Sequence, residues 1–261
     1  MRFTLTLSLD QINSKIPINY QYELSSWIYK TINEGNPEFA EFLHSRGYMN
    51  DNKSFKLFCF SNLIVPKFKT EFDRLVLACE QIKLMVSFYP IEAMEPFIVG
   101  LFKNQAFTIG DRKSHAGFVV SSVEKMKEPE FTDQMSFKFL SPIHVIRKNP
   151  FDPSKTDHLD PEHKDFEGNF FDNLINKYNA YHKSTDFDVS GLKLELLTEP
   201  RSKAIHIKQG TKQETILKSY FFDFKITAPA KLIRIGYYAG FGKENSQGFG
   251  FAEIRNEKLD V

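Results

Sequence analysis

The order of predicted strands and helices repeats along this chain, and that repetition limits the folds open to it. Alternating apolar residues predict strands, and apolar residues at helical spacing predict helices. Each half then reads strand, helix, strand, strand, helix, strand, which is the order of the ferredoxin-like unit. We therefore expect an α+β protein of two tandem ferredoxin-like (RRM-like) domains, residues 1–127 and 128–261, joined near Glu128-Pro129.

The helices are predicted from apolar faces and from end signals. Asn36 and Pro37 start a short helix, with the asparagine as its cap and the proline in its first turn, and Gly47 follows its end. The predicted helices are residues 20–32, 37–45, 89–102 (with Pro96 disturbing its middle), 165–181 and 228–240. The predicted strands are residues 2–9, 55–65, 74–88, 105–109, 117–125, 135–140, 144–148, 192–197, 203–208, 215–226 and 248–255, with a loop over 149–162.

Length and composition exclude several classes of protein. The chain has 261 residues, of which 41% are apolar and 26% charged, as in ordinary globular proteins. Its longest apolar runs, such as 75–78, fall far short of the ~20 residues that a membrane helix needs, and its N-terminus lacks signal-peptide features. Cys59 and Cys79 form no CxxC motif. We expect a cytoplasmic protein with no disulfide framework and no cysteine-rich zinc site.

Charge is distributed unevenly along the chain, although its formal net value is only +1. Residues 151–190 hold nine Asp and Glu against four Lys and Arg, whereas residues 199–234 hold eight Lys and Arg against three Asp and Glu. Phosphate binding depends on a local basic face and not on the whole-chain sum. The second segment is therefore a candidate nucleic-acid surface, and solvated strand edges are the alternative.

Residues 236–250 form the most specific stretch, with five glycines in 15 residues between a predicted helix and a predicted strand. Glycine allows backbone N–H groups to approach a phosphate closely, and a flexible connector is the alternative. The stretch is not a Walker loop, because no Gly-Lys-Ser/Thr follows at the required spacing. It is not a dinucleotide fingerprint either, because it follows a helix.

The full pattern of this stretch resembles the glycine-rich loop of the CRISPR-associated endoribonucleases that cut precursor repeat RNA (Cas family six). The pattern is Gly240-Phe241-Gly242, then Asn245-Ser246, then Gly248-Phe249-Gly250. Shorter similarities occur in the family's order along nearly the whole chain. They are Met1-Arg2-Phe3, Tyr20-Gln21-Tyr22, Ile28-Tyr29, Leu140-Ser141-Pro142-Ile143, residues 170–178 and Ile207-Lys208.

This resemblance implies two ferredoxin-like domains that bind CRISPR repeat RNA across basic surfaces. It implies metal-independent cleavage without a cofactor: a ribose 2′-hydroxyl attacks the adjacent phosphate and leaves 2′,3′-cyclic phosphate and 5′-hydroxyl ends. No membrane is involved, while association with other CRISPR effector subunits and a homodimer both stay open. So does the question of whether the repeat is structured.

The same resemblance implies three catalytic residues. His44 matches the family's catalytic histidine, and histidine suits proton transfer because it titrates near neutral pH; whether it acts as base or acid stays open. Tyr29 matches a tyrosine of the first helix that would position the 2′-hydroxyl or a phosphate oxygen. Lys56 matches a lysine that stabilises the transition-state charge, and Lys53 is its rival because the preceding loop varies in length.

RNA binding is expected in the basic hairpin and the glycine-rich stretch of the second half. For each basic residue, a solvated side chain is the alternative. The candidates are Arg201, Lys203, Lys208, Lys212, Arg234, Gly240, Gly242, Lys243, Gly248 and Gly250.

The sequence offers three other functions. A zinc site could be drawn from His158, His163 and His182 with neighbouring carboxylates, but a solvated acidic loop accounts for these residues better. A serine hydrolase lacks its G-x-S-x-G elbow. A repeat-RNA-binding protein of the same fold with weak or no catalysis is the serious rival, and the presence of His44 argues against it.

Overall fold

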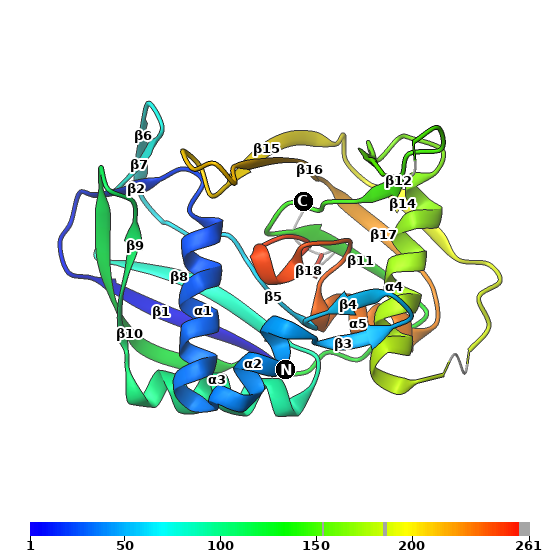
Figure 1. The fold of residues 1–261 in the computed structure, drawn as a ribbon, viewed down its shortest axis with the longest axis horizontal. Helices are drawn as coiled ribbons and strands as arrows, with labels where there is room; N and C mark the ends of the chain where they lie inside the picture. The colour runs from blue at the N-terminus through cyan, green and yellow to red at the C-terminus, as the bar shows by residue number, and fades with distance from the viewer. Residues whose placement is uncertain (153, 185–186, 256–261) are drawn as a thin grey trace.

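Two antiparallel sheets form the frame of the molecule, one in each half of the chain (Figure 1). The structure, a computed structural model, describes residues 1–152, 154–184 and 187–255. The first half (blue to cyan-green) and the second half (green to red) lie side by side, each with its own helices against its sheet. The expected α+β architecture is confirmed.

The first sheet is built around a central strand, β1, whose apolar face is buried. Its strands are β1 (Arg2–Leu9), β5 (Phe58–Phe60), β8 (Gln81–Phe88), β9 (Ala106–Gly110) and β10 (His115–Lys125), in the order β5-β8-β1-β10-β9. Leu5 and Leu7 of β1 are fully buried, and Leu5 lies opposite Leu84 on one side and Val123 on the other. Helices α1 (Gln21–Gly35) and α3 (Ile91–Lys103) supply the residues that cover this sheet.

The second sheet has a similar arrangement and a core rich in aromatic rings. Its strands are β11 (Gln134–Phe139), β14 (Lys193–Leu196), β17 (Asp223–Thr227) and β18 (Ala252–Ile254), in the order β14-β17-β11-β18. Phe137 and Phe224 stack with ring centroids 5.5 Å apart, and Phe241 packs against both. Helices α4 (Phe166–His182) and α5 (Ala230–Ala239) complete this core.

Both halves also contain short strands and helices outside the two main sheets. A three-stranded sheet joins β2 (Ser14–Pro17), β7 (Arg74–Leu77) and β6 (Phe68–Glu71). Three hairpins pair β3 (Tyr48–Asn50) with β4 (Lys53–Phe55), β12 (Ile146–Lys148) with β13 (Thr156–His158), and β15 (Arg201–Ile207) with β16 (Thr215–Phe221). The remaining helices are α2 (Pro37–Ser45) and the 3-10 turn η1 (Asn245–Gln247).

Two of these hairpins, β3-β4 and β15-β16, each reach across to the opposite half, and we call them the crossing hairpins (Figure 1). From β3-β4, the Asn50 amide donates to Asn176 Oδ1 of α4 at 2.9 Å. From the tip of β15-β16, Gln209 Oε1 accepts from Asn19, just before α1, at 3.1 Å. Each half of the chain therefore contributes one hairpin that packs against the other half.

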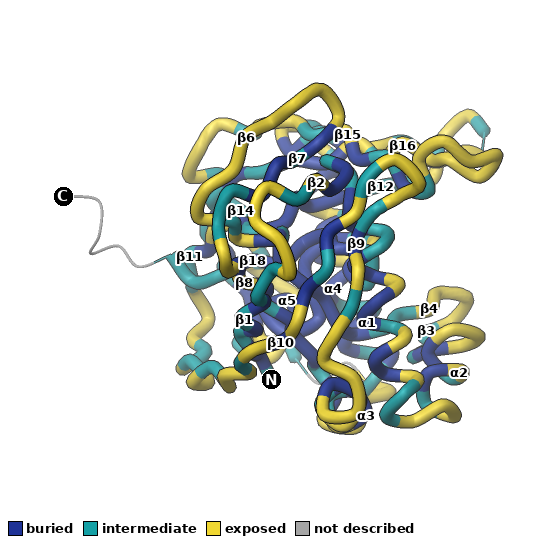
Figure 2. The backbone as a smooth tube through the Cα atoms, turned by 90° about the vertical axis from the view of Figure 1, so that its left-hand side faces the viewer, coloured by how far each residue is buried: buried dark blue, intermediate teal, exposed yellow. Residues whose placement is uncertain are grey.

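Buried residues divide into two main clusters. Figure 2 shows the buried stretches in dark blue, in the interior of the molecule. Each main cluster is dominated by residues of one half. Leu57 is an exception, since it follows the first crossing hairpin yet packs into the second cluster. A small third cluster joins Ile205, Ile207 and Phe249, with Tyr22 and Leu217 against them. It lies where the second crossing hairpin meets α1.

Most predicted elements are confirmed, and several differ. The predicted strand 74–88 is two strands, β7 and β8, which lie in different sheets, and the predicted strand 55–65 is shortened to β5. The predicted strand 215–226 is two strands, β16 and β17, because the chain leaves one sheet and enters another at Phe222. The predicted loop 149–162 contains β13, which pairs with β12. The predicted strand 248–255 is shortened to β18, because η1 and Gly248 to Phe251 belong to the preceding loop.

The predictions for the two ends of α2 are confirmed, whereas the expected disturbance of a helix at Pro96 is not seen. The Asn36 side chain accepts from Phe39 N at 3.0 Å and caps α2, and Gly47 follows that helix with a φ of +65°. Helix α3 runs through Pro96 without a break. No helix in the described part of the chain is long and apolar enough to cross a membrane.

Candidate active site

Tyr29, His44 and Lys56, the three predicted catalytic residues, line one cavity of about 750 Å³. They come from α1, from the end of α2 and from the segment after β4. The opposite wall is contributed by the second half, through the β15-β16 hairpin and the loop around η1. The site therefore needs both halves of the chain.

The backbone between His44 and Lys56 explains how these two residues meet. The N–H groups of Arg46 and Gly47 both donate to Phe42 O, which closes α2, and the left-handed Gly47 turns the chain into β3. A side chain at Gly47 would bring its Cβ within 2.6 Å of Phe55 O. The hairpin then returns the chain, so that Lys56 Nζ lies 3.5 Å from His44 O and 3.4 Å from Ser54 Oγ.

The three side chains differ in environment. Burial raises the pKa of Tyr29, against a smaller opposing effect of a hydrogen bond with Ser246, and the Tyr29 ring packs edge-on against Phe58 at 5.4 Å. Burial lowers the pKa of Lys56. His44 is exposed at the rim. Tyr29 thus keeps its proton across neutral pH, and the imidazole is open to a substrate.

The wall opposite these residues carries one of the predicted RNA-binding lysines. Lys208 lines the cavity, donates to Gln213 Oε1 at 2.5 Å and lies 5.7 Å from the ring centroid of Tyr22. Its backbone is left-handed, with a φ of 53°, at the point where β15 turns into the hairpin tip. The turn directs Lys208 back toward α1.

The loop from Gly240 to Gly250 forms the floor of the site, and it is packed and not flexible. Asn245 Nδ2 donates to Phe241 O and Phe249 O, both at 2.9 Å, and so ties the loop to itself. Ser246 O accepts from Ser25 Oγ of α1 at 2.6 Å. Gly250 has a φ of +73°, and a Cβ there would lie 1.8 Å from Phe241 O. This loop fixes Ser246 beside Tyr29.

Sequence models of two family domains match the chain in tandem. The model "CRISPR-associated protein Cas6, N-terminal" matches residues 15–124, and "CRISPR associated protein Cas6, C-terminal" matches residues 126–254. The chain belongs to the Cas6 family. The resemblance seen in the glycine-rich stretch is thereby confirmed.

Individual Cas6 relatives are similar over nearly their whole length. The CRISPR-associated endoribonuclease Cas6 1 of Methanocaldococcus jannaschii is 29% identical, over 99% of this chain and 95% of that protein. An endoribonuclease-like Cas6 protein of Pyrococcus furiosus is 26% identical, over 99% of this chain and 100% of that one. The solved structure of an RAMP protein described as binding different RNA substrates has a TM-score of 0.80 at 25% identity, with 98% and 100% of the two chains covered.

The other predicted RNA-binding residues of this Cas6 chain are scattered. Arg201 and Lys203 lie toward the far end of β15 from the cavity, and Lys212 is exposed at the hairpin tip. Arg234 on α5 pairs with Glu128, Nη2 to Oε1 at 3.2 Å. None of these four lines the cavity that holds Tyr29, His44 and Lys56. Lys243 and Lys53 line a neighbouring cavity.

The four glycines predicted to contact RNA are buried. Gly248 N and Gly250 N donate to Asn245 O and Pro142 O, and the carbonyls of Gly240 and Gly242 accept from Lys177 Nζ at 2.6 and 2.8 Å. Their geometry is that of close packing, and a contact with RNA stays a prediction for them.

Sequence reasoning missed several residues of the cavity. Tyr22, Gln213, Glu244 and Ser246 all line it. Tyr22 and Ser246 lie within the motifs that carry the family resemblance, so these motifs could have pointed to both residues. Gln213 and Glu244 have no local pattern that would single them out.

The zinc alternative finds no support in the described residues, where no three His, Cys, Asp or Glu side chains cluster as metal ligands. His163 instead accepts from Asp165 N at 3.1 Å, and His182 stacks on Tyr178 with ring centroids 4.2 Å apart.

Proposed function

We propose that this chain is a metal-independent endoribonuclease that cleaves CRISPR precursor RNA within its repeats. The observation that carries the proposal is the meeting of Tyr29, His44 and Lys56 at one cavity bounded by both halves. In the proposed reaction, a ribose 2′-hydroxyl attacks the adjacent phosphorus and the bond to the 5′ oxygen breaks. The products are a 2′,3′-cyclic phosphate and a 5′-hydroxyl.

The chemistry assigns one task to each side chain. His44 transfers a proton, to or from the reacting oxygens, and a group in this role contributes about 10²–10⁴-fold in rate. Tyr29, neutral because burial raises its pKa, donates a hydrogen bond to the 2′-hydroxyl or to a phosphate oxygen. Lys56 places a positive charge where the phosphorane becomes more negative. Lys208, on the opposite wall, holds a phosphate of the bound RNA.

We also infer that each half is a ferredoxin-like domain and that the boundary lies at residues 127 and 128. In each sheet the second, third, first and fourth strands of the β-α-β-β-α-β order are neighbours: β5-β8-β1-β10 in the first, and β14-β17-β11-β18 in the second. Strand β9 extends the first sheet, and the β15-β16 hairpin is inserted between β14 and β17 of the second.

The deciding experiment is cleavage of the host's own repeat RNA in EDTA. The wild type should cut, His44→Ala should be about 10²–10⁴-fold slower at similar RNA affinity, and an RNA with a 2′-deoxy at the cut site should resist both. His115→Ala is the matched control, since His115 is exposed on β10 and lines neither cavity. Equal cleavage by His44→Ala and wild type would remove His44 from the mechanism.

A second function, repeat-RNA binding with weak or no cleavage, is favoured by one feature of the site. Within the described residues, no side-chain hydrogen bond orients the His44 imidazole, and a relative over the full length is named only endoribonuclease-like. Under this function, wild type and His44→Ala bind the repeat equally and neither cuts it.

A further inference from the structure

A second cavity, of about 630 Å³, adjoins the catalytic one. Lys56, Glu244 and Ser246 line both cavities, so the two cavities meet at these residues. The second cavity lies between the β4 end of the first crossing hairpin, strand β12, helix α4 and the glycine-rich loop. A polymer held at the catalytic residues can therefore continue into it.

The walls of this second cavity are strongly basic. Two carboxylates, those of Asp172 and Glu244, stand against six cationic side chains. The six are Lys53, Lys56, Arg147, Lys148, Lys177 and Lys243. Burial lowers the pKa of Lys243; the charge of Glu244 opposes this effect and the charge of Lys53 adds to it. Burial, with a smaller contribution from the charge of Lys243, lowers the pKa of Lys177 to about 7. An anion in the cavity would relieve the repulsion between these lysines.

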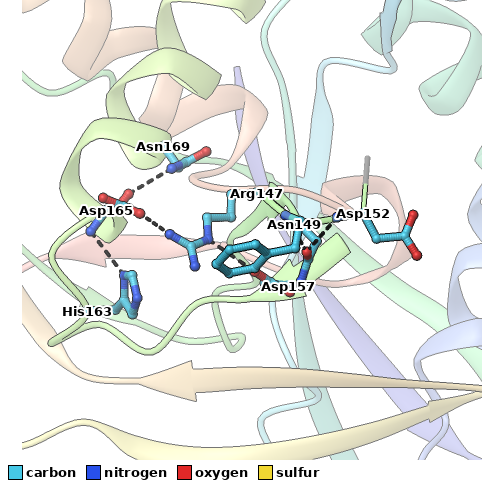
Figure 3. A network of polar contacts seen from close by, with 8 residues as sticks. Arg147, Asn149, Asp152, Asp157, His163, Asp165 and Asn169 are labelled. Atoms are coloured by element: carbon cyan, nitrogen blue, oxygen red, sulfur yellow. Dashed lines mark hydrogen bonds and ion pairs between the residues drawn. The ribbon is translucent and has the colours of Figure 1, made fainter. Parts of the chain in front are cut away.

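Two of the cations are fixed in place by the fold. Lys177 is 2% exposed and is held by the carbonyls of Gly240 and Gly242. Arg147 is oriented by Asp165 and by Asp157, whose Oδ2 lies 3.2 Å from its Nε; Asn149 in turn donates to Asp157 (Figure 3). The adjacent Lys148 is exposed at the end of β12. The basic wall is thus a preformed structure.

Asn173 requires a hydrogen-bond donor from the ligand, which an anion without a donor cannot supply. It lines the cavity and is 8% exposed, and among the described residues its Oδ1 has no hydrogen-bond partner. A buried acceptor without a donor carries a free-energy penalty. The phosphodiester of an RNA backbone has no donor to offer at neutral pH, whereas a nucleotide also has ribose hydroxyls and base N–H groups. The ligand that satisfies both features carries anionic oxygens and neutral donors.

We propose that this second cavity binds a nucleotide of the repeat RNA lying beyond the scissile dinucleotide, through its phosphate on Lys53 and Lys148 and through a hydroxyl or N–H donor on Asn173. The proposal rests on the proposed function, because it takes RNA to be the polymer in the catalytic cavity. It adds a specificity subsite that reads an adjacent nucleotide.

The test compares two double variants on uncleavable repeat RNA that carries a 2′-deoxy at the cut site. Lys53→Ala with Lys148→Ala should lower the affinity roughly tenfold and reduce the dependence of log affinity on log salt by about 1.4, as expected for two lost contacts to single-stranded RNA. Lys113→Ala with Lys127→Ala is the control, since both lysines are exposed and line neither cavity. An unchanged affinity and salt slope in the first variant would overturn the subsite.

Shortening the RNA tests which part of it occupies the cavity. Nucleotides are removed one at a time from each side, down to the dinucleotide that spans the cut. The penalty of the Lys53 and Lys148 double variant should vanish once the bound nucleotide is removed. A penalty that persists in the dinucleotide would mean a long-range effect of charge and would overturn the proposal. So would competition by inorganic sulfate, an anion without a donor at neutral pH, that is as effective as competition by a nucleoside monophosphate, because Asn173 would then play no part.

Failure of the subsite and failure of the proposed function give different results. If wild type does not cut the repeat RNA in EDTA, the proposed function fails. If wild type cuts and the double variant binds and cuts as wild type does, only the subsite fails.

Discussion

Lys56 owes its position to the residue that follows it. Leu57 has a φ of 53°, a left-handed conformation that costs a leucine about 1–3 kcal/mol. Its side chain enters the second core cluster, and its carbonyl accepts from Tyr89 N at 3.0 Å. The reversal at Leu57 leaves Lys56 facing both cavities. The sequence gives no sign of this strain, so it favours Lys56 over its rival Lys53 only through the family resemblance.

From the lowered pKa of Lys56 we predict that the proposed reaction is sensitive to alkaline pH. If its cationic form stabilises the transition state, the rate falls as pH rises through its pKa, and it falls at a lower pH than an ordinary lysine would give. In Lys56→Arg the guanidinium stays protonated, so this alkaline loss should disappear even if the maximal rate is lower. Single-turnover rates from pH 6 to 10 measure it, with Lys30→Arg of the exposed face of α1 as control. An identical alkaline limb in Lys56→Arg would exclude Lys56 as the titrating group.

Helix ends could be predicted from the sequence because they are determined by adjacent residues. The Asn36 cap and the Pro37 start gave α2 its observed bounds, because capping depends on a few adjacent residues. The division of 215–226 was missed for the opposite reason: alternation continues across Phe222, while the partner strands change from β15 to β11 and β14. A strand's partner is a tertiary property and leaves no mark on its own periodicity.

The glycine-rich loop depends on the absence of a side chain at its glycine positions. Gly250→Ala would place a Cβ 1.8 Å from Phe241 O at a φ of +73°, so we expect a loss of at least about 2–3 kcal/mol in unfolding free energy and a displaced Ser246. Gly168→Ala is the matched control, because Gly168 lies in α4 with open space around its Cβ position, and there alanine should add about 0.5–1 kcal/mol. Denaturant unfolding of both variants measures the difference, and a stable Gly250→Ala protein would contradict the packed loop.

Over the whole molecule, RNA binding depends on where the basic residues end up and not on how many there are. Charge counting marks residues 199–234 as basic, and Lys208 of this segment lines the cavity that holds Tyr29, His44 and Lys56. It did not separate Lys208 from Arg234, which pairs with Glu128 on another part of the surface. Nor did it include Arg147 and Lys148, whose charges are hidden in the sequence by the acidic stretch beside them.

This difference in position predicts different effects on RNA affinity. Lys208→Ala should weaken repeat-RNA binding several-fold and lower the salt dependence by about 0.7, the value for one phosphate contact to single-stranded RNA. Arg234→Ala should leave both unchanged. Filter binding at several salt concentrations makes the comparison. Equal losses in the two variants would mean that the RNA path also crosses α5.

The crossing hairpins tie the two halves together in both directions. β3-β4 rests on α4, where Lys183 Nζ donates to Met49 O at 3.0 Å, and β15-β16 rests beside α1 through Asn19 and Gln209. A contact between residues 190 positions apart has no local signature, so the order of elements alone could not predict it. An exchange of halves between related proteins would therefore yield a working chimera only if both hairpins kept their lengths. We therefore expect the two halves of this fold to evolve together, as a matched pair, and not as interchangeable modules.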